Sequence, residues 1–277
     1  APTPASALMH AGFVNAGGIL LTLFAPVFAS STSFMLLIVA VGGFSALLGK
    51  LLKSVQSNVK RKLGCSTVGQ MGFMIMQAGL GFFSAAVAHL MLHGFYKAYL
   101  FLSSSGRVEQ KAPQPKSQNP SPSTGVVGWI LTVVTAIGGG AVFAILTGKG
   151  TSMDSGLVLT LLVVLTTLHA THELVLNAEI APTVKPMVVL LVFVPAITVY
   201  SGVFIGVSAL MKDLPMVTAP TEFTVVHGIL GVVFTGAYIA IELELHHHSK
   251  RLYVTLLNLS QPSSDTVLTQ KEEYNEY

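Results

Sequence analysis

The sequence predicts an all-α bundle of about eight membrane-spanning helices. Three observations carry this prediction: the mean hydropathy is +0.69, 52% of the 277 residues are hydrophobic, and only 10% are charged. A soluble domain has about 25% charged residues, so one large water-soluble core is excluded. Intrinsic disorder needs the opposite composition and is excluded too. Backbone groups in hydrocarbon have to bond internally, which requires helices, because the polar–apolar alternation of a barrel strand is missing.

Eight apolar segments follow one another, and each has roughly the 20 residues that one span needs. They are residues 8–29, 34–52, 63–83, 85–102, 126–147, 156–176, 187–211 and 223–243. Residues 106–125 are rich in Pro, Ser and Gln, and predict an extended cytoplasmic linker that could also act as a hinge or docking strap. The linker divides a four-helix part, residues 1–105, from four further helices, residues 126–245. Residues 246–277 are expected to form a cytoplasmic tail, whose short apolar run 252–257 could lie on a surface, pack against a partner or be disordered.

The basic residues predict the orientation of these segments in a membrane. Cytoplasmic loops carry an excess of Lys and Arg. Twelve of the 15 basic residues fall on one side of the predicted helices, whereas Lys149 and Lys212 fall on the other and Lys97 lies inside a segment. We therefore expect a multi-pass inner-membrane protein with both ends of this chain in the cytoplasm.

The fourth segment carries three ionisable residues on one predicted helix face, namely His89, His93 and Lys97. Positions four residues apart differ by only about 40° around a helix, so the three form a stripe about 12 Å long. An imidazole accepts a proton on one nitrogen and releases one from the other, and burial disfavours the charged form of a lysine. The stripe therefore predicts a proton path. The alternative is that the histidines are packing residues and Lys97 extends to the cytoplasmic face.

Other polar residues inside the segments are candidates of a weaker kind. His10 lies near Gly12, Gly17 and Gly18, which allow close helix contact, and it either joins the proton path or bonds a neighbouring helix. Gln70 and Gln77 share one face and are expected to bridge helices.

A possible secondary proton path consists of His169, His172, Glu173 and Lys149, with a polar helix end as the alternative. A metal site is not expected, because zinc needs three or four protein ligands. Residues 138–140, Gly-Gly-Gly, could break the fifth segment as in some transporters, or could simply reflect that Gly is common in membrane helices.

Three motifs in order resemble the proton-pumping antiporter-like subunits. Residues 1–11, APTPASALMHA, resemble that family's Pro-Thr-Pro-Val-Ser-Ala-Leu-x-His-Ala. Residues 59–72, VKRKLGCSTVGQMG, are similar to Ile-Lys-Arg-x-Leu-Ala-Tyr-Ser-Thr-x-x-Gln-x-Gly, and residues 89–102, HLMLHGFYKAYLFL, to His-Leu-x-x-His-Ala-Phe-Phe-Lys-Ala-Leu-Leu-Phe-Leu. The resemblance covers residues 1 to about 105.

This family includes the largest antiporter-like subunit of respiratory complex I, the Mrp sodium/proton antiporter subunits, and the DabB subunits of inorganic-carbon accumulation complexes. Residues 9–18, 64–70 and 253–262 are most similar to DabB. The resemblance implies that His10, His89, His93 and Lys97 lie on the proton path. It also implies cation translocation that energises the conversion of CO2 to bicarbonate by a DabA-like soluble zinc partner related to carbonic anhydrases. The alternatives are a complex I or Mrp-type antiporter subunit and a non-conducting membrane scaffold.

The resemblance implies no covalent chemistry, cofactor, zinc or nucleic acid on this chain. The family's preceding helices, with a key Glu and Lys, are not in the sequence, and the fifth segment lacks the central Lys of the complex I version. We therefore expect a C-terminal piece that needs the N-terminal remainder of the same protein for a complete path.

Overall fold

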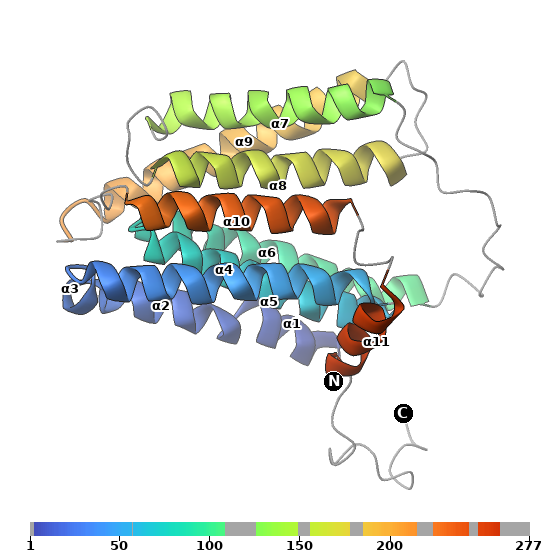
Figure 1. Ribbon diagram of the computed structural model, residues 1–277, viewed down its shortest axis with the longest axis horizontal. Coiled ribbons are helices and arrows are strands. Elements are labelled where there is room, and N and C mark those ends of the chain that lie inside the picture. The colour runs from blue at the N-terminus through green and yellow to red at the C-terminus, as the bar shows by residue number, and fades with distance from the viewer. Residues whose placement is uncertain are drawn as a thin grey trace, which may run out of the picture.

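The computed structural model is a bundle of helices that run up and down along one long axis (Figure 1). It describes residues 3–56, 58–108, 126–148, 156–177, 185–214, 224–243 and 249–260. The described residues contain no strand, which confirms the all-α prediction. The helices are α1 (Thr3–Ala11), the 3-10 helix η1 (Phe13–Asn15), α2 (Ala16–Leu23), α3 (Ala25–Phe28), α4 (Thr32–Ser54), α5 (Val59–Gly79), α6 (Phe83–Val108), α7 (Val126–Thr147), α8 (Gly156–Asn177), α9 (Lys185–Leu210), α10 (Val225–Glu242) and α11 (Lys250–Leu259).

The long helices correspond to the predicted apolar segments, with boundaries that differ by a few residues. Among the described residues, four stretches are long and apolar enough to cross a membrane, namely Thr3–Leu23, Thr32–Ser54, Gly128–Thr147 and Met187–Leu210. Two shorter apolar stretches, Gly156–Leu168 and His227–Ile241, lie in α8 and α10. The chain is therefore a multi-pass membrane protein. Helix α6 continues to Val108, so the start of the predicted linker is helical, and residues 109–125 lie outside the described part.

The first predicted segment is a broken helix. Helix α1 ends at Ala11. In a continuous α-helix the N–H of Asn15 would bond the Ala11 carbonyl, but here it bonds the Gly12 carbonyl at 3.0 Å. The Asn15 side chain donates from Nδ2 to the Ala11 carbonyl at 2.6 Å. By contrast, α7 runs unbroken through Gly138–Gly140, where a Cβ on Gly139 would lie 2.7 Å from Ile197. Gly139 and Gly140 thus lie at close helix contacts, and the break lies in the first segment.

Glycines also bring α4 and α5 into close contact. A Cβ on Gly42 would lie 2.7 Å from the Gly72 carbonyl oxygen, and one on Gly49 would overlap with the backbone of Gly69. Small residues at such positions let two membrane helices approach backbone to backbone. Helix α6 packs on the α5 member of this pair.

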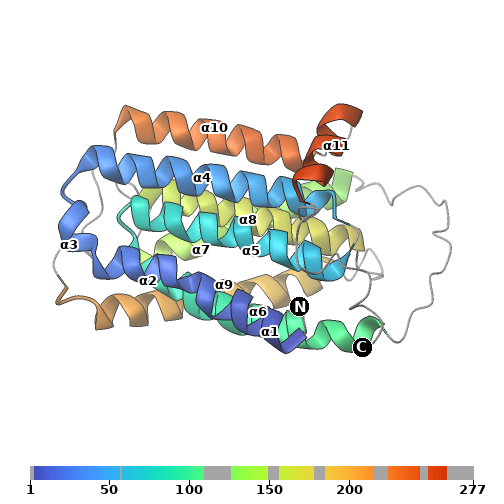
Figure 2. The same ribbon diagram turned by 90° about the horizontal axis from the view of Figure 1, so that it is seen from below.

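The helices before and after the linker share one hydrophobic core. The buried cluster includes Met35 and Met74 from the first part and Phe143 and Leu159 from the second. Helix α10 contacts both α4 and α8, and α9 contacts α6 (Figure 2). The Lys50 ammonium lies 3.5 Å from the centre of the Tyr238 ring, a cation–π contact between α4 and α10.

The two ends of the bundle differ in charge. Figure 1 shows the start of α1 and the transverse helix α11 at the same end, where α4 ends and α5 begins. Gln56 Nε2 donates to Ser260 Oγ at 2.7 Å and ties α11 to the end of α4. The exposed Lys60, Arg61 and Lys62 lie there, whereas Lys212 follows α9 at the other end. This arrangement places the described basic side chains mainly at one end.

Candidate proton-path site

Helix α6 brings the three ionisable residues of its stripe to one face, on which His93 and Lys97 are buried and His89 is half-buried. His93 is 5% exposed and Lys97 is 1% exposed. The rings of His89 and His93 lie with their centroids 5.9 Å apart. The structure therefore places these three residues together, in contact with α5, α1 and α9, which surround α6.

Lys97 is held inside the bundle. Its Nζ donates a hydrogen bond to the Leu63 carbonyl oxygen of α5 at 3.0 Å, and the same oxygen accepts from Thr67 Oγ1 at 3.0 Å. The side chain is therefore enclosed by the bundle rather than exposed at its surface. The ammonium thus meets a neutral acceptor on a neighbouring helix.

His10 joins the stripe from the broken helix. Its ring stacks on Phe101, with centroids 4.8 Å apart and planes 8° apart, and Phe101 lies one turn beyond Lys97. A Cβ on Gly64 would lie only 3.7 Å from His10 Cε1, so the glycine leaves room for the ring. A Cβ on Gly94, the residue after His93, would lie 3.0 Å from the carbonyl oxygen of Ala11, the residue after His10, so α1 and α6 pack closely here. All four predicted proton-path residues therefore lie in one region.

Gln77 and Tyr200 extend this region toward α9. Gln77 Oε1 lies 3.2 Å from His89 Nδ1, and Gln77 Nε2 donates to the Tyr200 hydroxyl oxygen at 3.4 Å. Gln77 is 1% exposed. The expected helix-bridging role of Gln77 is thus seen, whereas Tyr200 was not singled out by the sequence. Its only signal was a lone tyrosine within the apolar segment 187–211.

A cavity of about 390 Å³ lies beside the stripe, between helices of the two parts. Its size admits several water molecules, each of which takes about 30 Å³ in the liquid. Its polar lining comes from α5, α6, α8 and α9, and consists of Ser66, Gln70, Gln77, His89, His93, Tyr96, Lys97, Thr166, Thr167 and Tyr200. Polar side chains from four helices thus line one open cavity, together with apolar side chains such as Phe73 and Phe193.

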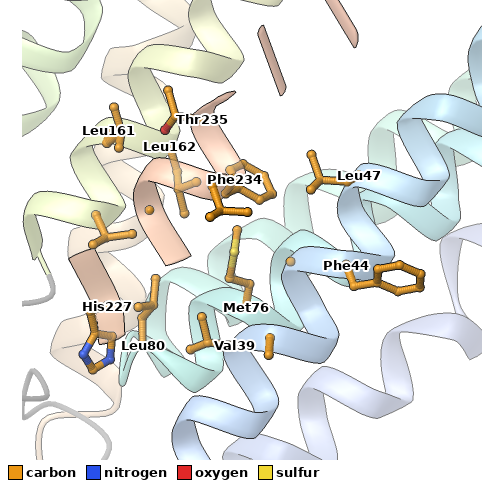
Figure 3. A pocket seen from close by; sticks show the side chains of 15 residues that line it. Val39, Phe44, Leu47, Met76, Leu80, Leu161, Leu162, His227, Phe234 and Thr235 are labelled. Atoms are coloured by element: carbon orange, nitrogen blue, oxygen red, sulfur yellow. The ribbon is translucent and has the colours of Figure 1, made fainter. Parts of the chain in front are cut away.

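A second cavity has a different character. It measures about 200 Å³ and lies between α4, α5, α8 and α10, where Figure 3 shows mainly apolar side chains such as Val39, Met76 and Phe234. His227 lines it, but this ring has a local role, because its Nδ1 accepts from the Thr224 backbone N–H at 3.2 Å at the start of α10. This cavity offers no line of polar groups.

The predicted secondary path is described only in part. The His172 ring packs on Trp129 of α7, with centroids 4.8 Å apart. The side chains of His169 and Glu173, and all of Lys149, lie outside the described residues, so the secondary path stays a prediction. In the part of the chain that the structure covers, no three His, Cys, Asp or Glu side chains are grouped to hold a metal ion.

Comparison with known proteins shows a likeness to one family in the first part of the chain. Residues 1–120 match the NADH:quinone oxidoreductase/Mrp antiporter transmembrane family. The three residues of the stripe and the nearby His10 all fall within this match. The resemblance to antiporter-like subunits is therefore confirmed for the first part of the chain.

Individual relatives point to one branch of this class. The chain is 50% identical over 109 residues to a probable inorganic carbon transporter subunit, DabB1, of Halothiobacillus neapolitanus, which covers 39% of this chain and 20% of the relative. It is 44% identical over 161 residues to a probable inorganic carbon transporter subunit, DabB, of Bacillus anthracis. This match covers 57% of this chain and 31% of the relative. A chloroplast NAD(P)H-quinone oxidoreductase subunit 5 of Chaetosphaeridium globosum is 41% identical over 124 residues, covering 43% and 18%.

These matches confirm the likeness to DabB. The chain spans between a fifth and a third of the length of the DabB relatives that it matches. The names of these relatives as subunits also indicate proteins that work within multi-subunit assemblies.

Proposed function

We propose that this chain forms part of a DabB-like membrane subunit that translocates protons and so energises inorganic-carbon uptake. The observation that carries this proposal is the stripe of His89, His93 and Lys97, of which His93 and Lys97 are buried, beside a cavity with polar side chains in its lining. A charged side chain at the centre of a bilayer costs roughly 2.5–3.5 kcal/mol on insertion scales, so such residues are rarely kept without a function.

The contacts of the stripe suit proton transfer. The Lys97 ammonium bonds a neutral carbonyl, and burial next to a neutral acceptor makes release of a proton easier than in an ion pair. His93 and His89 follow at intervals of one helical turn and can each take up and return a proton. His10 lies at the Lys97 end of the line, on the broken helix. We propose that the line is completed by the N-terminal remainder of the same protein.

The proposed chemistry of carbon uptake takes place on a partner. A DabA-like soluble zinc subunit would hydrate CO2 to bicarbonate in the cytoplasm, and this chain would supply the driving force from the inner membrane. One charge that crosses a membrane at 100 mV releases about 2.3 kcal/mol, which changes a hydration equilibrium by more than tenfold. Support for this partner comes from the relatives named as inorganic carbon transporter subunits.

A second candidate is a subunit of a quinone oxidoreductase or an Mrp-type sodium/proton antiporter. The match to the chloroplast quinone oxidoreductase subunit supports it. That match extends over 124 residues, whereas the DabB match from Bacillus anthracis extends over 161, well beyond the shared motifs. The longer match favours the first candidate.

Purification of the tagged complete protein from its own cells tests the proposal. We expect one soluble zinc-containing protein to co-purify, with zinc measured by mass spectrometry of the metals. Deletion of either subunit should abolish growth that depends on inorganic-carbon uptake. Co-purification of redox subunits or other antiporter subunits, without zinc, would establish the second candidate instead.

A further inference from the structure

Helix α11 lies across the direction of the long helices, at one end of the bundle (Figures 1 and 2). It is more amphipathic than any of the long helices. Leu256, at the centre of its apolar face, is only 4% exposed. Leu252 and Leu259 lie within about 60° of Leu256 around the helix, yet they are 41% and 67% exposed. The bundle therefore covers only part of this apolar face.

The end of α4 fixes the height of α11 relative to a membrane. Helix α4 has 23 residues and is about 34 Å long at 1.5 Å per residue, compared with about 30 Å for the hydrocarbon core of a bilayer. Leu37, Val41 and Phe44 of α4 are each more than half exposed, as lipid-facing side chains are. Gln56, two residues beyond α4, donates to Oγ of Ser260, the residue after α11. This bond holds α11 at the level of the lipid headgroups.

The basic residues around α11 complement anionic headgroups. Arg251 is exposed in the first turn of α11 and lies about 140° from Leu256 around the helix. Lys60, Arg61 and Lys62 are exposed in the first turn of α5, at the same end of the bundle. A helix with basic residues on its polar face and leucines on the other typically lies in the plane of the membrane interface, where anionic lipids attract its cations.

We propose that α11 is an interfacial helix that binds anionic phospholipid. Leu252 and Leu259 enter the boundary between headgroups and acyl chains, while Arg251 and the basic first turn of α5 contact the lipid phosphates. Lipid is the occupant of this face because α11 lies at the level where lipid surrounds the exposed side of α4. The inference depends on the placement of the bundle in a membrane and not on proton transfer.

The depth of the two faces of α11 can be measured by electron paramagnetic resonance. The complete protein, with its own cysteines replaced, carries one nitroxide at Leu259→Cys or at Asn258→Cys, in vesicles of phosphatidylglycerol and phosphatidylcholine. Asn258 is exposed about 160° from Leu256 around the helix and is the matched control. We expect the nitroxide at position 259 to collide mainly with oxygen, which concentrates in the bilayer, and the one at position 258 to collide mainly with a water-soluble nickel chelate.

Two results of this measurement would contradict the inference. A nitroxide at position 259 that collides with the nickel chelate as often as the one at position 258 would place α11 in water. A nitroxide at position 259 that is shielded from both oxygen and nickel would show a protein partner on this face instead. Lys97→Met tests the proposed function and should leave both depths unchanged, so the two proposals can fail separately.

Lipid preference tests the charged side of the helix. A fluorophore at Leu259→Cys is quenched by brominated lipid, and competition between phosphatidylglycerol and phosphatidylcholine gives the preference for the anionic lipid. Arg251→Gln should lower this preference about fivefold, the effect of one basic residue at an anionic surface. Lys212→Gln, at an exposed position at the other end of the bundle, is the control and should not change it. An unchanged preference in Arg251→Gln would overturn the inference.

Discussion

Lys97 is the side chain whose burial needs the strongest physical explanation. It is 1% exposed, and its hydrogen bond to the Leu63 carbonyl supplies a neutral partner. We predict that Lys97→Met abolishes coupled transport, because the thioether carries no proton. Insertion should not suffer, since Met is less costly to bury than an ammonium. The measurement is complementation of cells that need inorganic-carbon uptake, with membrane levels of the protein assayed in parallel.

Lys97→Arg tests whether the site needs a side chain that releases a proton or only one that carries a positive charge. Lys97→Arg keeps a cation, but a guanidinium does not release its proton in proteins, so this variant should also fail. Lys60→Met, which removes an exposed lysine at the start of α5, is the matched control and should complement. Full complementation by Lys97→Met at normal abundance would show that the relay interpretation is wrong.

The sequence identified the residues on single helices better than the contacts between helices. The spacing of His89, His93 and Lys97 was sufficient to place them on one face, because helical geometry fixes it. Tyr200 could not be found in this way, since its importance depends on which helix packs against α6. The part of the site that comes from α9 is therefore a product of tertiary packing.

Close packing of α4 and α5 depends on Gly42 more than on its neighbour Gly43. A Cβ on Gly42 would meet the Gly72 carbonyl oxygen at 2.7 Å, whereas one on Gly43 would meet Met76 Sδ at an ordinary 3.5 Å. Gly42→Ala should therefore lower the free energy of unfolding by about 1–3 kcal/mol, because overpacking forces the backbones apart. Gly43→Ala is the adjacent control and should change it little. Unfolding in denaturing detergent measures both variants, and equal stabilities would contradict this account.

The break between α1 and α2 is stabilised by Asn15. Its side chain bonds the Ala11 carbonyl, which the backbone N–H of Asn15 does not reach because it bonds Gly12. Asn15→Ala should lower the free energy of unfolding by about 1–3 kcal/mol, the cost of an unsatisfied buried group.

Thr22→Ala offers a control for this prediction. Thr22 Oγ1 makes a similar bond, to the Gly18 carbonyl at 2.9 Å, but within the regular helix α2. Its loss leaves the helical ladder in place and should cost less. The comparison uses the same unfolding assay, and a larger effect of Thr22→Ala would show that Asn15 does not stabilise the break.

The location of this break shows what composition alone leaves open. Gly138–Gly140 and the stretch from Gly12 to Gly18 are both glycine-rich. In α7 the glycines face Ile197 and Val164 of neighbouring helices, which hold the helix regular, whereas the stretch after Ala11 adopts a 3-10 turn. Whether a glycine-rich stretch breaks a helix or packs against another helix therefore depends on the helices that surround it.

The helices as a set were predictable, but their assembly was not. Hydropathy alone gives the number and approximate extent of the apolar segments, because each has to satisfy its backbone internally. The sequence suggested two parts separated by a linker, yet Met74, Phe143 and Leu159 share one core. A linker composition carries no information on contacts across it, so the joint cavity between the parts became visible only in three dimensions.

The charge difference between the two ends of the bundle predicts its orientation in the membrane. Lys60 is exposed at the end where α5 begins, and Lys212 is exposed at the opposite end, after α9. Because basic residues are retained in the cytoplasm, we expect Lys60→Cys to react with a membrane-impermeant maleimide only from the cytoplasmic side and Lys212→Cys only from outside.

Both variants are made in a Cys65→Ala background, since Cys65 is the single cysteine of this sequence. Thr132→Cys, at a fully buried position in α7, is the control that should react from neither side until detergent opens the bundle. Reaction of Lys60→Cys from outside would show the opposite orientation, with the basic end of the bundle facing away from the cytoplasm.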